Sequence, residues 1–149
     1  NTIKALGKLN KLNSKFEVLE EEIKDVSIAI GHTRWATHGK VLLENTHPIL
    51  SENVAVVHNG IIENHDQIRL ELKEKNVVFE TSTDTEVIPH LLNSSMKKND
   101  NFFDACVSVV KKIEGAYAFA AIHSLKEEIF VEVRTSVSLE VNIIPIWQL

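Results

Sequence analysis

Two short apolar segments near the end of the chain, 116–122 and 128–133, constrain the fold most strongly. They are separated by a polar stretch of a few residues, so they predict a β-hairpin and an antiparallel pair of strands. Further short strands are predicted at 26–30, 54–57 and 77–79. Predicted helices occur between these strands without strict alternation of strand and helix. The pattern favours a layered α+β fold over a doubly wound parallel sheet.

Helices with one apolar face are predicted at several places along the chain. One covers 64–75 and buries Ile68 and Leu72. The next begins at Thr83, with Glu86 three residues further on in the position of a capping box. A surface helix or two is also predicted within the first 25 residues, where apolar side chains recur at helical spacing: Leu9, Leu12, Phe16 and Leu19.

A helix is also predicted over 101–112, ending before Gly115. It contains the single cysteine of the chain, Cys106. A thiol buried on an apolar face has a raised pKa and low reactivity, so we expect a structural role for it. The predicted buried face consists of Phe102, Phe103, Cys106, Val109 and Val110.

The composition is that of one ordinary globular domain, with 149 residues of which 44% are hydrophobic and 25% charged. The formal net charge of −5 argues against nucleic acid as a partner, because phosphate binding needs a basic surface. No apolar run is long enough to cross a membrane, and residues 1–19 lack the apolar core of a signal peptide. One cysteine cannot form an internal disulfide. These features predict a cytoplasmic protein.

The segment 31–39 follows a predicted strand and contains Arg34, Trp35, Thr37 and His38. Polar groups at the end of a strand are well placed to meet a ligand. The Arg34 guanidinium could bind a carboxylate through two parallel hydrogen bonds, and the Thr37 hydroxyl could add another. The alternative is a surface ion pair for Arg34 and a core position for Trp35, which is the commoner outcome for such a segment taken alone.

The segment 56–65 contains the pair Asn59 and Gly60. A side-chain amide beside a backbone N–H that a ligand can approach closely can form an oxyanion hole. Asn-Gly between apolar runs is also the usual two-residue turn of a β-hairpin. The local sequence by itself favours that turn.

Asp84 lies in the first turn of a predicted helix, within 81–86. Its carboxylate could bind the ammonium group of a ligand. It could equally complement the helix dipole, which is the more frequent use of an acidic residue at this position.

Five of the seven histidines lie between His32 and His65, which raises the hypothesis of a metal-binding module. No pair has the i, i+4 spacing of a helical zinc site. No carboxylate or thiol completes a recognisable ligand set. We therefore expect no metal site.

Five segments in the order found here, 32–39, 45–48, 57–65, 82–88 and 114–118, are together typical of one family. Through them the chain resembles the glutaminase domain of the class II glutamine amidotransferases. Within that class it is most similar to the glutamine–fructose-6-phosphate aminotransferases, or glucosamine-6-phosphate synthases. The resemblance is strong over 26–134, whereas 135–149 is atypical. Five segments in register outweigh the local alternatives above.

The resemblance implies a four-layer αββα N-terminal-nucleophile hydrolase sandwich, truncated at both ends in this chain. It implies hydrolysis of glutamine to glutamate and ammonia without a cofactor. In that family the ammonia passes to a sugar-isomerase domain, which converts fructose 6-phosphate into glucosamine 6-phosphate. The implied partners are L-glutamine and that domain, which lies outside 1–149, in a homo-oligomeric cytoplasmic enzyme with no nucleic-acid or membrane partner.

The resemblance also implies roles for individual residues. Asn59 and Gly60 correspond to the oxyanion-hole pair, and Trp35 to a tryptophan that gates the passage of ammonia. Arg34 corresponds to the residue that holds the α-carboxylate of glutamine, and Asp84 to the one that receives its ammonium group. The implied substrate-binding residues are Arg34, Thr37, His38, Gly60 and Asp84.

The nucleophile of the family is an N-terminal cysteine whose own α-amine acts as the base. Asn1 occupies the first position here, and Cys106 has no free α-amine, so the chain as given is predicted to be inactive in glutamine hydrolysis. Two alternatives stay open. The chain could be a non-catalytic glutamine-binding or regulatory fragment, or it could belong to the glutaminase domain of another class II amidotransferase.

Overall fold

The computed structural model describes residues 2–23, 26, 28–33, 42–98, 100–126 and 128–134. None of the helices within these ranges is long and apolar enough to cross a membrane. In chain order the elements are α1 (Leu9–Ile23), β1 (Ile49–Ser51), β2 (Val54–Gly60), α2 (His65–Lys73), the 3-10 helix η1 (Asp84–Glu86), α3 (Val87–Met96), α4 (Phe102–Lys112), β3 (Tyr117–His123) and β4 (Glu128–Arg134).

The four strands form one antiparallel sheet in the order β1-β2-β3-β4. The predicted hairpin is confirmed as β3 and β4, paired from Tyr117 opposite Arg134 to His123 opposite Glu128. β2 and β3 pair along their full lengths. The α+β class is therefore confirmed. Within the described ranges the strands make a single sheet, so a second sheet of the expected sandwich is not among them.

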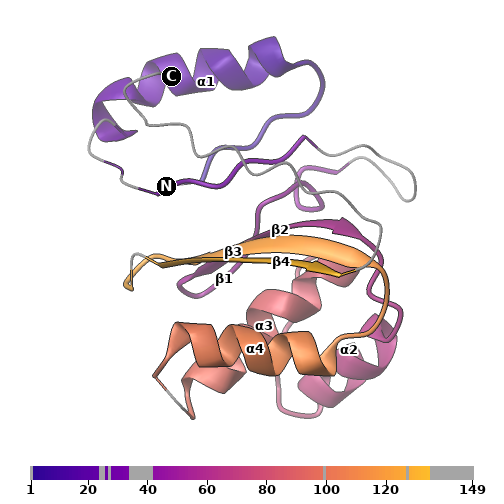
Figure 1. The fold of residues 1–149 in the computed structure, drawn as a ribbon. Helices are drawn as coiled ribbons and strands as arrows, with labels where there is room; N and C mark the ends of the chain where they lie inside the picture. The colour runs from indigo at the N-terminus through magenta and orange to yellow at the C-terminus, as the bar shows by residue number, and fades with distance from the viewer. Residues whose placement is uncertain are drawn as a thin grey trace.

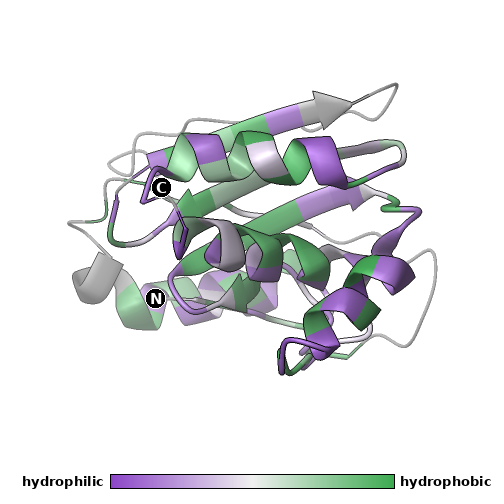
Figure 2. Cartoon of the chain, turned by 90° about the horizontal axis from the view of Figure 1, so that it is seen from below, coloured by the Kyte–Doolittle hydropathy of each residue, from purple (hydrophilic) through white to green (hydrophobic). Residues whose placement is uncertain are grey.

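Helices α2, α3 and α4 cover one face of the sheet, and α1 lies on the opposite side (Figure 1). Figure 2 views the helical layer from below and shows polar and apolar residues alternating along the helices, as expected when one face of each is buried. The core lies between this layer and the sheet. It includes Val54, Val56, Ile68, Leu72, Val87, Ile88, Leu92, Phe102, Cys106, Val109, Tyr117, Phe119 and Ala121.

Two predicted strands, 26–30 and 77–79, are wrong. Neither the described residues of 26–30 nor those of 77–79 pair with any strand of the sheet. Val26 and Val78 are exposed, whereas Val77 and Phe79 pack against the core as partly buried side chains. A short apolar run shows that a segment can be buried, but strand pairing also needs a neighbouring backbone, which the run does not encode.

Helix α2 forms where it was predicted and buries Ile68 and Leu72. Asn64 stands at its N-cap position, yet its side chain makes no capping hydrogen bond. Its amide instead donates to the Lys112 carbonyl oxygen and accepts from the Glu114 N–H, both at 3.0 Å. Asn64 thus ties the start of α2 to the segment that leads from α4 into β3.

The predicted capping box at Thr83 and Glu86 is not formed, although a helix does begin there as η1 followed by α3. The Glu86 carboxylate is only 2% exposed and accepts hydrogen bonds from the backbone N–H groups of Glu80 at 2.7 Å and Thr81 at 2.8 Å. Arg69 lies 3.9 Å from it and supplies a compensating charge. The Glu86 carboxylate therefore holds the loop that leads into η1 in place.

Cys106 of α4 is fully buried, and burial raises the pKa of its thiol to about 12, as expected for a structural cysteine. The prediction that Phe103 is buried is wrong, since 61% of its surface is exposed. Phe102 faces the core instead, and the next residue lies about 100° further around the helix. Phe103 packs edge-on against Phe130 of β4, with ring centroids 5.8 Å apart.

Candidate functional site

Asn59 and Gly60 are the last two residues of β2, where they pair with Ala118 and Tyr117 of β3. They do not form the two-residue hairpin turn that the local sequence favours. Pairing with β3 keeps the backbone extended through both residues, so a tertiary contact overrides the local preference. The pair thus stands at the end of a central strand.

Gly60 is required here for a steric reason. Its φ is +106°, and a Cβ atom at this position would lie 2.2 Å from the carbonyl oxygen of Ala116. The Ile61 N–H donates to that same oxygen at 3.0 Å, which makes Gly60 and Tyr117 a non-hydrogen-bonded pair of the ladder. The Gly60 N–H therefore points away from β3, on the side of β2 that β1 leaves uncovered because it pairs only with 54–56.

The Asn59 side chain projects from the face of the sheet opposite to α2, α3 and α4. His58 precedes it and faces the helical layer, and successive side chains of a strand alternate between the two faces. The carbonyl oxygen Oδ1 of Asn59 lies 2.6 Å from Nε2 of His32. Since Oδ1 can only accept, His32 donates this hydrogen bond and the amide NH₂ group of Asn59 points away from His32.

Asp84, the first residue of η1, lies beside the end of β2. Its Oδ2 accepts a hydrogen bond from the backbone N–H of Ile62 at 2.9 Å, and its Oδ1 accepts one from the N–H of Thr85 at 2.9 Å. The side chain is 23% exposed. A carboxylate has about four acceptor positions, so these two bonds leave capacity for a ligand ammonium group.

Three histidines, His32, His47 and His58, form a cluster that joins Asn59 to the start of η1. The rings of His32 and His47 have centroids 4.4 Å apart. The Thr85 hydroxyl lies 3.1 Å from Nε2 of His47 and 2.9 Å from Nδ1 of His58. Burial lowers the pKa of His58, with nearby Asp84 opposing the shift and His32 adding to it. The buried His58 is therefore a neutral residue near pH 7.

Sequence reasoning assigned no role to His32, His47 or His58. A signal was available, since each lies inside one of the five family segments, but a lone histidine next to an apolar run is usually part of the core. Across the described ranges, no group of three or more His, Cys, Asp or Glu residues is arranged to hold a metal ion.

A buried amide, Asn45, joins the loop before β1 to the loop before η1. Its Oδ1 accepts from the Ser82 N–H and its Nδ2 donates to the Ser82 hydroxyl, both at 3.1 Å. Together with the bonds of Asp84 and His32 and the pairing of β2 with Tyr117 and Ala118 of β3, these contacts bring the described parts of all five family segments to one place. Segments spread over more than half of the chain thus meet at the end of β2.

The other predicted site residues, Arg34, Trp35, Thr37 and His38, lie outside the described residues. Their roles stay predictions. His32, the first residue of the family segment 32–39, is described and lies against Asn59. This end of the segment therefore reaches the candidate site.

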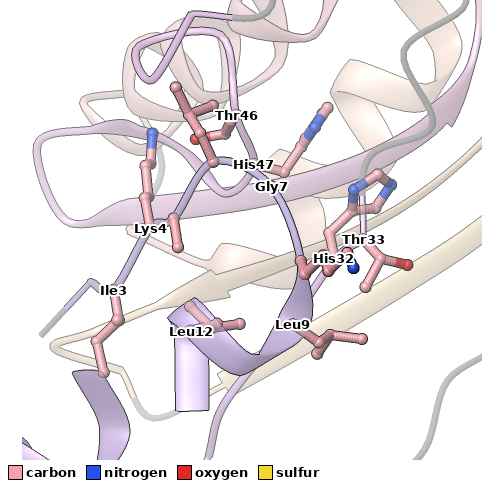
Figure 3. Close-up of a pocket in the computed structure, with 12 residues that line it drawn as sticks. Ile3, Lys4, Gly7, Leu9, Leu12, His32, Thr33, Thr46 and His47 are labelled. Carbon is pink, nitrogen blue, oxygen red and sulfur yellow. The ribbon is translucent and has the colours of Figure 1, made fainter. Parts of the chain in front are cut away.

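A cavity of about 160 Å³ is lined on one side by His32 and His47 (Figure 3). Its opposite wall is the segment that leads into α1. Asn59, Gly60 and Asp84 are not among its lining residues, so it borders the candidate site without being part of it. The labelled lining residues are Ile3, Lys4, Gly7, Leu9, Leu12, His32, Thr33, Thr46 and His47.

The chain is similar to known proteins of one family. A family model described as "Glutamine amidotransferase domain" matches residues 32–136. The glutamine–fructose-6-phosphate aminotransferase [isomerizing] of Idiomarina loihiensis is 40% identical over 144 residues, which is 96% of this chain and 24% of that protein. The protein of the same name from Buchnera aphidicola is 46% identical over 121 residues, or 80% of this chain and 19% of that protein.

Two solved structures resemble the fold. One is the glutamine phosphoribosylpyrophosphate amidotransferase of B. subtilis complexed with ADP and GMP, with a TM-score of 0.53 and 33% identity over 62% of this chain and 20% of that one. The other is described as the allosteric regulatory enzyme of purine biosynthesis, with a TM-score of 0.56 and 35% identity over 62% of this chain and 21% of that one.

The fold is that of the N-terminal-nucleophile amidotransferases. The chain belongs to the glutamine amidotransferase domain family. It spans 24% of the length of the Idiomarina relative and 19% of the Buchnera relative.

Proposed function

We propose that this chain is the glutamine-binding part of a glutaminase domain in a glutamine–fructose-6-phosphate aminotransferase. The observation that carries the proposal is the position of Asn59 and Gly60 beside Asp84, where Ile62 bonds to the Asp84 carboxylate. The names of the relatives at 40–46% identity support the particular enzyme. Residues 1–149 would then be part of a type-2 amidotransferase domain, with 135–149 as an atypical segment.

The arrangement suits glutamine because the ligand carries one carboxylate and one ammonium group. Arg34 would bind the carboxylate, with Thr37 and His38 beside it, and Asp84 would bind the ammonium group. The Gly60 N–H and the Asn59 amide would stabilise the negative oxygen that develops on the side-chain carbonyl during hydrolysis.

Cys106 is not the nucleophile in this proposal. Its thiol is fully buried in α4, and a pKa of about 12 leaves it in the unreactive protonated form. The chain is therefore assigned glutamine binding and oxyanion stabilisation. A non-catalytic glutamine-binding or regulatory role uses the same pocket and is the second candidate.

In the whole protein, the ammonia released would pass to a sugar-isomerase domain that makes glucosamine 6-phosphate from fructose 6-phosphate. Trp35 would gate that passage. The name shared by the relatives supports this partner. A homo-oligomer in the cytoplasm, without nucleic acid or membrane as a partner, completes the proposal.

Isothermal titration calorimetry with L-glutamine and with glutaramate, which lacks the α-ammonium group, tests the pocket. We expect the chain to bind glutamine at least about tenfold more tightly than glutaramate, which corresponds to one charge-assisted hydrogen bond. Asp84→Asn should remove that difference, and Arg34→Ala should abolish binding of both ligands. Asp66→Asn is the matched control, because the Asp66 side chain is 88% exposed in the first turn of α2. Absence of glutamine binding by the parent chain would overturn the proposal.

A further inference from the structure

The carboxamide of Asn59 can serve an oxyanion in only one of its two orientations. Its oxygen and nitrogen ends have nearly the same shape, and a flip about the terminal bond exchanges them. Only the NH₂ end can donate a hydrogen bond to a negative oxygen. A site that uses Asn59 therefore needs a group that distinguishes the two ends.

His32 is placed to make that distinction. Its Nε2 lies 2.6 Å from Oδ1 of Asn59, across 27 positions of sequence. A flipped carboxamide would direct its N–H donors at the N–H of His32 and lose this bond. The N–H on Nε2 thus favours the orientation in which the NH₂ group faces away from the ring.

The His32 ring is itself held from the side of η1. It packs on the His47 ring at 4.4 Å with an interplanar angle of 40°. Nε2 of His47 is 3.1 Å from the hydroxyl of Thr85, which is 1% exposed. Thr85 directly follows Asp84, so the support of the His32 ring begins next to the proposed ammonium-binding residue.

The other nitrogen of His32, Nδ1, is buried and makes no hydrogen bond with the part of the chain that the structure describes. The bond to Asn59 is therefore the polar interaction that orients this ring within the described residues. The 2.6 Å contact with Oδ1 requires the tautomer that carries a proton on Nε2, because an amide oxygen can only accept.

We propose that His32 is a positioning residue: it donates from Nε2 to Oδ1 of Asn59 and so holds the Asn59 amide with its NH₂ group toward the glutamine carbonyl, with His47 supporting the ring. This inference rests on the proposed function, because it assigns His32 a task at the oxyanion-binding residue. In this role His32 acts neither as a base nor as an acid.

Two variants separate the hydrogen bond from the packing. His32→Gln keeps an N–H donor near the position of Nε2, whereas His32→Phe keeps a ring against His47 and removes the donor. His123→Phe is the matched control, since it makes the same substitution at a buried histidine that lies at the opposite end of β3 from Tyr117 and packs on Phe102.

The first readout needs no ligand. In ¹⁵N NMR of the parent chain we expect His32 to be protonated at Nε2 and the two side-chain amide protons of Asn59 to give separate, protected signals. In His32→Phe the two amide protons should exchange rapidly with solvent or merge into one averaged signal. In His32→Gln the two separate, protected signals should return. A deprotonated Nε2 in the parent chain overturns the proposal even if His32→Phe fails to fold. Unchanged Asn59 signals in a folded His32→Phe variant also overturn it.

The second readout is glutamine affinity. We expect His32→Phe to weaken glutamine binding about tenfold, as for the loss of one oriented hydrogen bond, while His32→Gln and His123→Phe stay within about twofold of the parent. If the parent chain binds no glutamine, the proposed function fails, and the ligand-free amide signals still decide the role of His32. Equal affinities for His32→Phe and His32→Gln overturn the positioning role.

Discussion

The carboxylate of Asp84 accepts a hydrogen bond from the backbone N–H of Ile62 at 2.9 Å. This bond joins the start of η1 to the segment that follows Gly60 in β2, across 22 positions of sequence. The acid proposed to bind a ligand ammonium group is thus also a structural anchor for the proposed oxyanion-binding backbone. The two roles are separable, because an amide oxygen can still accept from Ile62 but cannot supply a negative charge.

We therefore expect Asp84→Ala to lower the free energy of unfolding by about 1–3 kcal/mol, because it leaves the Ile62 N–H without its partner. Asp84→Asn should cost clearly less, since the Asn oxygen can take over the bond. Urea denaturation followed by circular dichroism measures both values. Asp66→Ala serves as the control at an exposed position. Equal losses for Ala and Asn at position 84 would contradict the anchoring role.

Gly60→Ala should be severely destabilising. The new Cβ would lie 2.2 Å from the Ala116 carbonyl oxygen in a backbone with φ of +106°, so β2 and β3 would have to separate at their ends. We expect a loss of about 3 kcal/mol or more in the free energy of unfolding.

Gly31→Ala is the control for this substitution, because a Cβ atom there meets no atom of the described residues within 4 Å. Its stability, measured in the same urea titration, should stay close to that of the parent chain. A Gly60→Ala variant as stable as the Gly31→Ala variant would contradict the close approach of β2 to Ala116.

The stability of the chain should fall as the pH is lowered from about 7 to about 5. Burial lowers the pKa of His58 and of His90 in the folded chain. In the unfolded chain both imidazoles have a pKa of about 6.5, so below this pH the unfolded chain binds more protons than the folded chain does. The stabilisation is therefore complete above this value and is lost as the pH falls toward the folded pKa values.

Urea titrations at several pH values give the slope of stability against pH. His58→Gln should reduce this slope, and the double variant His58→Gln/His90→Gln should reduce it further. A slope unchanged in the double variant would show that the two buried imidazoles do not set the pH dependence.

The Cys106 thiol should be almost inert in the folded chain. It is fully buried, so a reagent cannot reach it, and its pKa is raised to about 12, so almost none of it is present as the reactive thiolate. Ellman's reagent at pH 8 should label it at the rate of unfolding, and labelling should be complete and fast in urea. Rapid labelling without urea would mean that α4 does not pack against the sheet as described.

The sequence predicted those features that are determined by residues close together along the chain. The helices α2 and α4 and the hairpin of β3 and β4 were predictable because apolar spacing and turn residues act within a few positions. The family segments also pointed to the candidate site, since the residue types around Asn59 and Asp84 match the chemistry of glutamine.

The tertiary structure decided the features that depend on neighbours far along the chain. Asn59 and Gly60 extend a strand because β3 pairs with them, although the same two residues alone favour a turn. Glu86 bonds to the loop at 80–81 instead of capping a helix. His32 meets Asn59 across 27 positions, a contact that only the path of the chain can create. Local preferences are worth about 1 kcal/mol or less per residue, so strand pairing and buried hydrogen bonds outweigh them.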